Sequence, residues 1–343
     1  MSAGAPEKPA SLRVTHEMWV AMLCDPVMAA FVIFGVRLDA FQASRLRYYW
    51  WVQNVIDSSG ITSGKTIVDF VFLSLRCILI PNQEVAIYYP SFETGKTSFW
   101  EYFASFTQPT SPMYSKTFVS QLGNPLKLDR EDEIAGDGTT HGPACYKAFF
   151  RNNNKLKMPA PSFARDAVTS ASLRLNVLVI EEWPHVDAAS DGINKQLIDR
   201  TTRASWNQYH PIWGNHILYT AHAQTLMHPA APRYKDHQRK VNAGNPTYAN
   251  IAYSYKDYSD LPCHSGKSFK DEFRIESTIE NKRNTCSPAE WLGQGFGIWG
   301  ASGIGWITEE MILRAQENGR RCGLIPVLSR QQFLESLARP ATN

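Results

Sequence analysis

The chain has 343 residues, of which 43% are hydrophobic and 20% are charged, and its formal net charge is +3 at pH 7. These values are ordinary for a soluble globular protein with room for one large α/β domain and a smaller appendage. A net charge of this size is compatible with a polyanionic partner but does not require one.

The sequence argues against a disulfide-rich or metal-ribbon protein, a membrane-spanning protein and a secreted protein. The six cysteines are scattered, with no C-x-x-C pair, which argues against a disulfide framework or a metal ribbon and for reduced thiols in the cytosol. The apolar stretches 27–36 and 67–80 are too short or too interrupted to span a bilayer. The polar, proline-rich residues 1–10 do not resemble a signal peptide. We therefore expect a soluble cytoplasmic protein without a membrane partner.

The first predicted elements are helices. Apolar spacing over residues 14–33 predicts two helices separated at Pro26, and residues 38–51 predict a third. Gln42 lies just upstream of a glycine-containing loop, where a glutamine amide can read the adenine edge through paired hydrogen bonds. The alternative interpretation is an exposed helical glutamine.

Residues 54–66, NVIDSSGITSGKT, predict a strand, a tight polar loop and the start of a buried helix that continues through residues 67–75. The loop approximates the Walker A pattern G-x-x-x-x-G-K-[ST], in which backbone N–H groups and the helix N-terminus cradle nucleotide phosphates. Lys65 is expected to reach the β- and γ-phosphates and Thr66 to hold Mg²⁺. Ser59 stands where the pattern has its first glycine, so Gly60 is expected to supply the turn. The predicted nucleotide contacts of the loop are Ser59, Gly60, Ser63, Gly64, Lys65 and Thr66. The alternative is a Ser/Gly turn that precedes a core helix.

A second Gly-Lys-Thr, at residues 95–97, follows a predicted strand at 84–90 and competes with the first. Counting back from Gly95 places Pro90 at the position of the first glycine, where proline offers no N–H group. We therefore rank this loop second and expect it to contact nucleic acid or the flank of the nucleotide.

The second half of the chain predicts further strands. Residues 107–162 are irregular, with one or two short elements. The apolar run 173–180 predicts a buried parallel strand that ends at Glu181-Glu182, and residues 217–223 predict a third strand. Strands that alternate with helices predict a mostly parallel, doubly wound sheet with its site at the carboxyl ends of the strands.

The acidic pair at the end of the apolar strand is typical of a Walker B motif. Glu181 is expected to bind Mg²⁺ through water, and Glu182 to orient and deprotonate the water that attacks the γ-phosphate. Such ATPases usually place aspartate first, so Glu181 is a departure. The alternative is an acidic surface turn.

Thr220 and His222 follow the third strand, where they are candidates to sense the γ-phosphate; the alternative is a polar strand end. An arginine that stabilises transition-state charge is also expected. The candidates, chosen by position only, are Arg165, Arg200 and Arg203. Each of these is otherwise a solvated surface arginine.

The order of these motifs resembles the ATPase portion of the large terminase subunit, the DNA-packaging motor of tailed bacteriophages. The resemblance covers nearly the whole chain, although each motif is short. It rests on Phe41-Gln42, the loop 59–66, the strands 85–90 and 177–182, Tyr219–His222, and the segments 289–293 and 305–310.

The resemblance implies a RecA-like P-loop ATPase of the additional-strand (ASCE) class, with a mostly parallel sheet flanked by helices. It implies an N-terminal helical segment (1–50) with the adenine motif, an ATPase core (51–253) and a small C-terminal linker subdomain (254–343), in which 308–318 is predicted as a helix. The implied ligands are ATP and Mg²⁺. The implied partners are double-stranded DNA, the portal and procapsid, the small terminase subunit and further copies in a ring, in the host-cell cytoplasm.

Two departures qualify the resemblance. Family loops often carry a basic residue where Ile61 and Thr62 stand here, so no arginine is expected from the loop itself. The family's nuclease domain has no room in 343 residues, so no DNA cleavage is expected. The alternatives are a catalytically idle DNA or capsid adaptor, a helicase-type ATPase, for which a second RecA-like domain is not evident, and a metabolic kinase, for which no acceptor motif is evident.

Overall fold

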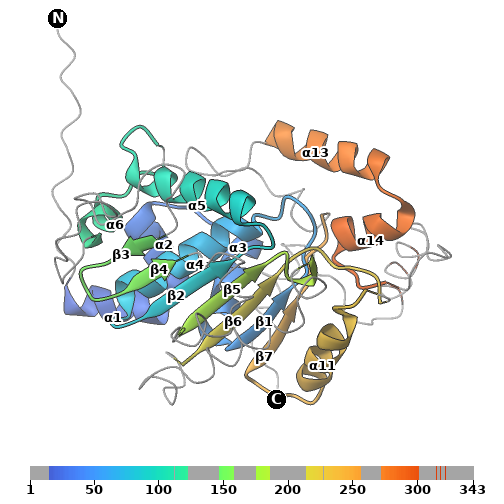
Figure 1. Cartoon of the computed structure of the whole chain (residues 1–343), viewed down its shortest axis with the longest axis horizontal. Coiled ribbons are helices and arrows are strands. Elements are labelled where there is room, and N and C mark those ends of the chain that lie inside the picture. The colour runs from blue at the N-terminus through green and yellow to red at the C-terminus, as the bar shows by residue number, and fades with distance from the viewer. Residues whose placement is uncertain are drawn as a thin grey trace, which may run out of the picture.

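The computed structural model describes residues 15–111, 113–122, 147–157, 175–185, 214–226, 228–255 and 272–300, with the single positions 314, 317 and 321. A central sheet runs through the molecule, with helices packed around it (Figure 1). The helices are α1 (His16–Cys24), α2 (Pro26–Phe34), α3 (Ala40–Trp51), α4 (Lys65–Leu79), α5 (Phe92–Thr107), α6 (Lys116–Gln121), α11 (Ala231–Asn242), α13 (Glu272–Thr285) and α14 (Pro288–Phe296). The strands are β1 (Asn54–Asp57), β2 (Glu84–Tyr88), β3 (Lys147–Phe149), β4 (Lys155–Lys157), β5 (Val177–Glu181), β6 (His216–Thr220) and β7 (Tyr248–Ile251).

The sheet has seven strands in the order β3-β4-β2-β5-β6-β1-β7. All neighbouring strands are parallel except β3 and β4, which form an antiparallel pair at one edge. β6 lies between β1, which leads into the glycine loop, and β5, which ends in the acidic pair. That inserted strand defines the additional-strand class, so the predicted fold class is confirmed by the topology itself.

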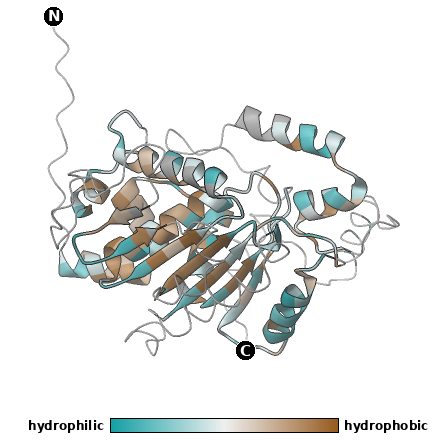
Figure 2. Ribbon diagram, viewed as in Figure 1, coloured by the Kyte–Doolittle hydropathy of each residue, from teal (hydrophilic) through white to brown (hydrophobic). Residues whose placement is uncertain are grey.

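Alternate residues of the strands enter two different cores, as the two-residue period of a strand requires. Val55 and Val177 pack into the larger cluster with α2, α4 and α5. Their neighbours Ile56 and Leu178 belong to the cluster on the opposite face, which includes Trp183. The apolar strands and the polar surface of α11 are both visible in Figure 2.

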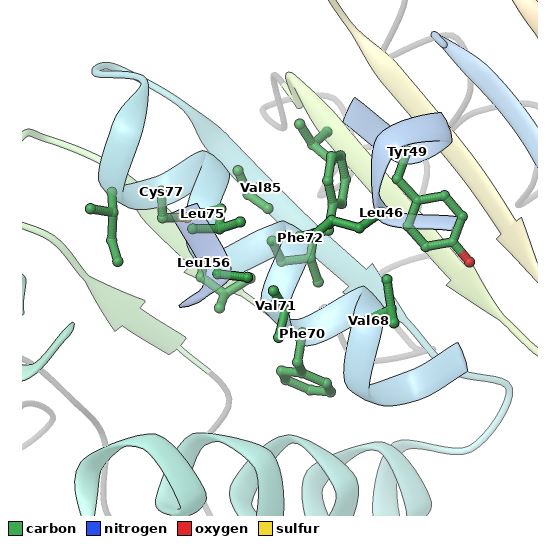
Figure 3. Close-up of a cluster of buried hydrophobic side chains, with 14 of the residues drawn as sticks. Leu46, Tyr49, Val68, Phe70, Val71, Phe72, Leu75, Cys77, Val85 and Leu156 are labelled. Carbon is green, nitrogen blue, oxygen red and sulfur yellow. The ribbon is translucent and has the colours of Figure 1, made fainter. Parts of the chain in front are cut away.

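α4 is the central helix of the larger core. Every residue from Ile67 to Leu79 is buried, including the polar Asp69, Ser74 and Arg76, so the helix is covered on all sides. Figure 3 shows its side chains lying between α3, which contributes Leu46, and the sheet, which contributes Val85. Phe70 faces α5, where its ring centroid is 5.8 Å from that of Phe99.

The predicted break at Pro26 is confirmed. Asp25 ends α1, and its side chain then accepts a hydrogen bond from the Val27 N–H at 3.0 Å, so that it caps α2. Pro26 occupies the first position of α2, where its missing N–H group costs nothing.

The region after residue 107, predicted as irregular with short elements, contains β3 and β4. These two strands extend the main sheet.

The second Gly-Lys-Thr was expected to lie in a loop, and this expectation was wrong. Residues 95–97 lie within α5, which begins at Phe92, directly after the β2 segment. The Ser91 side chain caps the helix, and the Gly95 N–H donates to the Ser91 carbonyl at 3.0 Å. With these N–H groups bonded inside a helix, the segment cannot form a phosphate-binding loop.

Some predictions fall outside the described residues. They are the linker motif at 305–310, most of the predicted helix 308–318, and the three arginine candidates, Arg165, Arg200 and Arg203. Within the described ranges, no helix has the length and apolar character that crossing a membrane requires.

Candidate active site

The loop between β1 and α4, residues 58–64, carries the predicted Walker A residues. Gly64 has φ 72° and forms the N-terminal cap of α4, and Thr62 has φ 59°. Gly60 is not in the left-handed region, so the prediction that it supplies the turn was wrong; Thr62 and Gly64 make it. Ser59 needs no left-handed backbone either, which explains why a serine is accepted there.

The first N–H groups of the loop are bonded to other segments. Ser59 N donates to Asp57 Oδ1 at 2.9 Å, and Gly60 N donates to the carbonyl of Tyr253 at 2.9 Å. These two residues shape the loop through these backbone bonds, and their predicted contact with a nucleotide stays a prediction.

The N–H groups at the end of the loop, in contrast, have no acceptor within the helix that they begin. Those of Gly64, Lys65 and Thr66 belong to the first turn of α4, where a helix has no internal acceptor. Among the described residues, no side chain caps this helix end. All three residues are partly exposed. An uncapped, accessible helix N-terminus of this kind favours an anion.

Lys65 lies across the 58–64 loop. Its ammonium donates to the carbonyl of Ser59 at 2.6 Å and to that of Gly60 at 3.1 Å. Burial lowers the pKa of Lys65, and the carboxylates of Asp57, Glu182 and Glu181 oppose that shift. The predicted lysine and the predicted acidic pair are thus close enough to interact.

Glu181 is buried at the end of β5, next to α4. Burial raises the pKa of its carboxyl group to about 7, while the nearby side chains of Asp69, Thr66 and Lys65 act to lower the pKa. Burial also raises the pKa of Asp69 well above its usual value. Two buried carboxyl groups close to each other disfavour carrying two negative charges at once. Thr66, at the start of α4, lies near enough to affect the pKa of Glu181, and their pairing as metal ligands stays a prediction.

Glu182 follows directly and has an unusual backbone. Its φ is 48°, in the left-handed region that a glutamate adopts only at a cost. The conformation turns its side chain toward His222, whose Nε2 lies 4.0 Å from Glu182 Oε1. Burial raises the pKa of Glu182 and lowers the pKa of His222 to about 3. His222 is therefore a neutral partner beside the expected base.

Thr220 completes a row across three strand ends. In the sheet register it lies opposite Glu181 on one side and opposite Asp57 on the other. Its Oγ1 is buried, with no hydrogen-bond partner in the described part of the chain. The three residues lie at the carboxyl edge of the sheet, where the sequence predicted the site.

Gln42 is buried rather than exposed, which excludes the surface interpretation. Its Oε1 accepts a hydrogen bond from the Asp39 N–H at 3.1 Å and completes the capping box of α3. Its Nε2 lies close to Gly64, since a Cβ atom added there would be 2.4 Å away. Gln42 thus lies beside the 58–64 loop, and its role with adenine stays a prediction.

These residues fit a magnesium–nucleotide complex. The uncapped end of α4 suits phosphates, and Glu181 Oε1 and Thr220 Oγ1 are buried polar atoms without a hydrogen-bond partner among the described residues. Mg²⁺ would be held by Thr66 and, through water, by Glu181. No cluster of three or more potential metal-binding side chains occurs in the described ranges, so phosphate and water oxygens would supply the other ligands, as is usual for Mg²⁺.

Three residues that the sequence analysis missed also belong to the site: Arg45, Asp57 and Asp69. Arg45 and Asp57 form a fully buried ion pair under the 58–64 loop. Asp69, a charge within the apolar helix segment 67–75, carried a signal in the sequence, because buried charges need partners; Arg45 and Asp57 did not.

Helix α14 and the residues that follow it contact the 58–64 loop. Ile61 N donates to the carbonyl of Gln294 at 2.7 Å, and Trp299 Nε1 donates to Ser58 Oγ at 2.9 Å. Ile61 also packs with Trp291 and Phe296 in a small apolar cluster. The residues predicted to follow the ATPase core therefore pack directly on its nucleotide loop.

No protein-family model matches the chain, and no curated protein matches it. Solved structures do. The large terminase of a thermophilic bacteriophage is similar over 77% of this chain, with 12% identity and a TM-score of 0.49, both in one crystal form and in a complex with ADP. The large terminase ATPase domain of Thermus phage P74-26 is similar over 83% of this chain and 98% of its own length, with 12% identity and a TM-score of 0.46.

The chain spans about half of the first of these terminases, 54% of its length. That terminase has also been solved in complex with ATP-gamma-S. The resemblance to large terminases, stated from the motifs, thus has a counterpart in solved structures. At 12% identity this likeness concerns the fold.

Proposed function

We propose that the chain is an ATP-hydrolysing motor subunit that moves double-stranded viral DNA into a procapsid. One observation carries the hydrolytic part: Lys65 and Thr66, at the uncapped start of α4, lie beside Glu181 and Glu182 at the end of β5. Phosphate binding, a metal ligand and a general base are thereby brought together by two elements that are far apart in the sequence.

The residues divide the chemistry among them. The N–H groups of Gly64 to Thr66 and the Lys65 ammonium bind the phosphates and offset their charge. Mg²⁺, when bound at Thr66 and Glu181, supplies further neutralisation of the phosphate oxygens. Glu182 orients the attacking water and accepts its proton, and its raised pKa suits this task. Thr220 and His222 lie where they can sense the γ-phosphate.

The motor part rests on different support. The hydrogen bond from Ile61 to Gln294 gives the nucleotide loop a direct connection to α14, and a motor needs such a connection to convert hydrolysis into movement. The order of motifs in the sequence supports double-stranded DNA as the substrate. It also supports a homo-oligomeric ring on the portal, the small terminase subunit as a partner and a location in the host-cell cytoplasm.

An arginine must complete the site during turnover. Arg165, Arg200 and Arg203 remain the candidates, in cis or from a neighbouring copy. A purified subunit that lacks its neighbour would then hydrolyse ATP slowly, and conditions that favour assembly would raise the rate.

The experiment is ATP turnover by the purified chain, with and without linear double-stranded DNA, beside Glu182→Gln. We expect turnover that rises with protein concentration and with DNA, and that Glu182→Gln abolishes. Nucleotide binding without turnover, unchanged by Glu182→Gln, would instead identify an idle adaptor. Stimulation by single-stranded DNA with unwinding of a forked duplex would identify a helicase.

A further inference from the structure

Arg45, on α3, connects the two ends of the 58–64 loop. Its Nε pairs with the Asp57 carboxylate, at the point where β1 ends and the loop begins. Its Nη1 donates to the carbonyl of Ser63 at 2.8 Å and its Nη2 to Ser63 Oγ at 3.2 Å, next to the start of α4. A single guanidinium group, fully buried, thus spans the base of the loop.

The partners of Arg45 are themselves fixed. Asp57 accepts hydrogen bonds from Tyr49 Oη at 2.8 Å and from Ser59 N at 2.9 Å. The ring of Tyr253 lies 5.5 Å from the guanidinium carbon. Burial acts to lower the pKa of Arg45 and to raise that of Asp57, but their mutual attraction outweighs it, so both groups are charged.

The contact with Ser63 has a consequence for the next residue. A trans peptide is planar, so the carbonyl of Ser63 and the N–H of Gly64 point in opposite directions. When Arg45 holds the Ser63 carbonyl toward the core, it directs the Gly64 N–H away from the core. That N–H is one of the groups assigned above to the phosphates.

Gln42 acts on the same part of the loop. It lies three residues before Arg45, on the same face of α3, and its Nε2 lies against Gly64. Helix α3 therefore bonds to Ser63 through Arg45 and lies against Gly64 through Gln42.

We infer that Arg45 is a positioning residue for nucleotide binding, which orients the Ser63–Gly64 peptide so that its N–H faces the phosphates. The inference rests on the proposed function, because it concerns the same loop. Arg45 touches no phosphate itself; it acts through Ser63. Its loss should therefore weaken nucleotide binding and raise KM for ATP, with a smaller effect on kcat.

The first test is Arg45→Lys. Lysine keeps the positive charge beside Asp57, but its ammonium is a single point and cannot span Asp57 and Ser63 as the planar fork does. Titration with a fluorescent ADP analogue should show affinity at least about tenfold lower than for the wild type, the scale of one hydrogen bond to a charged group. Thermal unfolding is measured on the same samples.

The matched control is Arg76→Lys. Arg76 is also a fully buried arginine, and it donates to Gln83 Oε1 at 3.0 Å and to the carbonyl of Gly214 at 3.3 Å. It lies near the other end of α4 from the loop. Its replacement should lower thermal stability but leave ADP affinity at the wild-type value.

The double variant Arg45→Gln with Asp57→Asn replaces Arg45→Lys in this test if Arg45→Lys does not fold. Because both charges of the ion pair are removed together, neither partner is left as an unpaired buried charge. It should also lose affinity about tenfold, because the contact with the Ser63 carbonyl is again disrupted. Wild-type affinity in a folded Arg45 variant, or an equal loss in Arg76→Lys, would overturn the inference. Failure of the wild type itself to bind ADP or ATP would instead overturn the proposed function, and this inference with it.

Discussion

The backbone N–H of Ile61 donates to the carbonyl of Gln294 at 2.7 Å, so the tip of the nucleotide loop is bonded to the end of α14. Nearby, Gly297 approaches Ser58 so closely that a Cβ atom on it would lie 2.6 Å from the Ser58 carbonyl oxygen. The two segments are far apart in the sequence, but they pack without space for a side chain between them. The loop and the α14 segment are therefore in direct contact.

This packing predicts a specific effect of Gly297→Ala. The new methyl group would clash with the Ser58 backbone, and the residue would also have to keep φ at 68°. We expect the free energy of unfolding to fall by about 2 kcal/mol or more and nucleotide affinity to fall with it. Chemical denaturation and titration with a fluorescent nucleotide measure the two effects.

Gly244→Ala is the control for that substitution. Gly244 has almost the same backbone, φ 72°, but a Cβ atom there would meet nothing within 4 Å. It should show only the cost of the left-handed backbone, about 1 kcal/mol, and normal nucleotide affinity. Equal effects of the two substitutions on affinity would contradict the close packing of α14 on the loop.

The left-handed backbone of Glu182 predicts that this residue lowers the stability of the folded chain. Asparagine tolerates φ near 48° better than glutamate or glutamine does. Glu182→Asn should therefore raise the free energy of unfolding by about 1 kcal/mol relative to Glu182→Gln, although both variants lack the base and should have no turnover. Thermal unfolding of the two variants, side by side, measures the difference. Equal stability would show that the backbone at this position is not strained.

The environment of His222 predicts a pH effect on stability. Burial, with the nearby charge of Lys65, lowers its pKa from 6.5 to about 3 in the folded chain. The unfolded chain therefore binds a proton as the pH falls below 6.5, while the folded chain stays neutral there, and stability is lost between pH 6.5 and about 3.

His222→Gln should remove this contribution. Its stability curve should be flatter than that of the wild type over the same range, as measured by denaturation at a series of pH values. The buried His237, whose pKa is also lowered, to about 4, remains in both proteins and cancels in the comparison. Parallel curves would show that His222 is not held neutral by the fold.

The elements that could be predicted from the sequence are those determined by residues close to one another in the chain. The apolar runs of β2, β5 and β6, the Pro26 break and the Walker A loop were all found because periodicity, capping and glycine spacing act over a few residues. The acidic pair was placed correctly because a buried parallel strand identifies its own carboxyl end.

The remaining features depend on contacts between distant segments. β7 is only four residues long, with alternating buried and half-buried positions, and pairing with β1 gives it its place. Arg45 lies on α3 and Asp57 ends the next element, β1, so only the way that the helix packs on the strand shows that they form a pair. The second Gly-Lys-Thr matched a pattern, but the Ser91 cap had already started a helix there.

The most direct test of the central claim compares ATP turnover in Lys65→Ala and Lys96→Ala, at a protein concentration that allows assembly. The two lysines occupy equivalent places in the two Gly-Lys-Thr sequences, but only Lys65 follows a loop at the end of a strand. We expect Lys65→Ala to reduce turnover to the background rate and Lys96→Ala to retain most of it. Loss of turnover in Lys96→Ala, with Lys65→Ala active, would contradict the site described here.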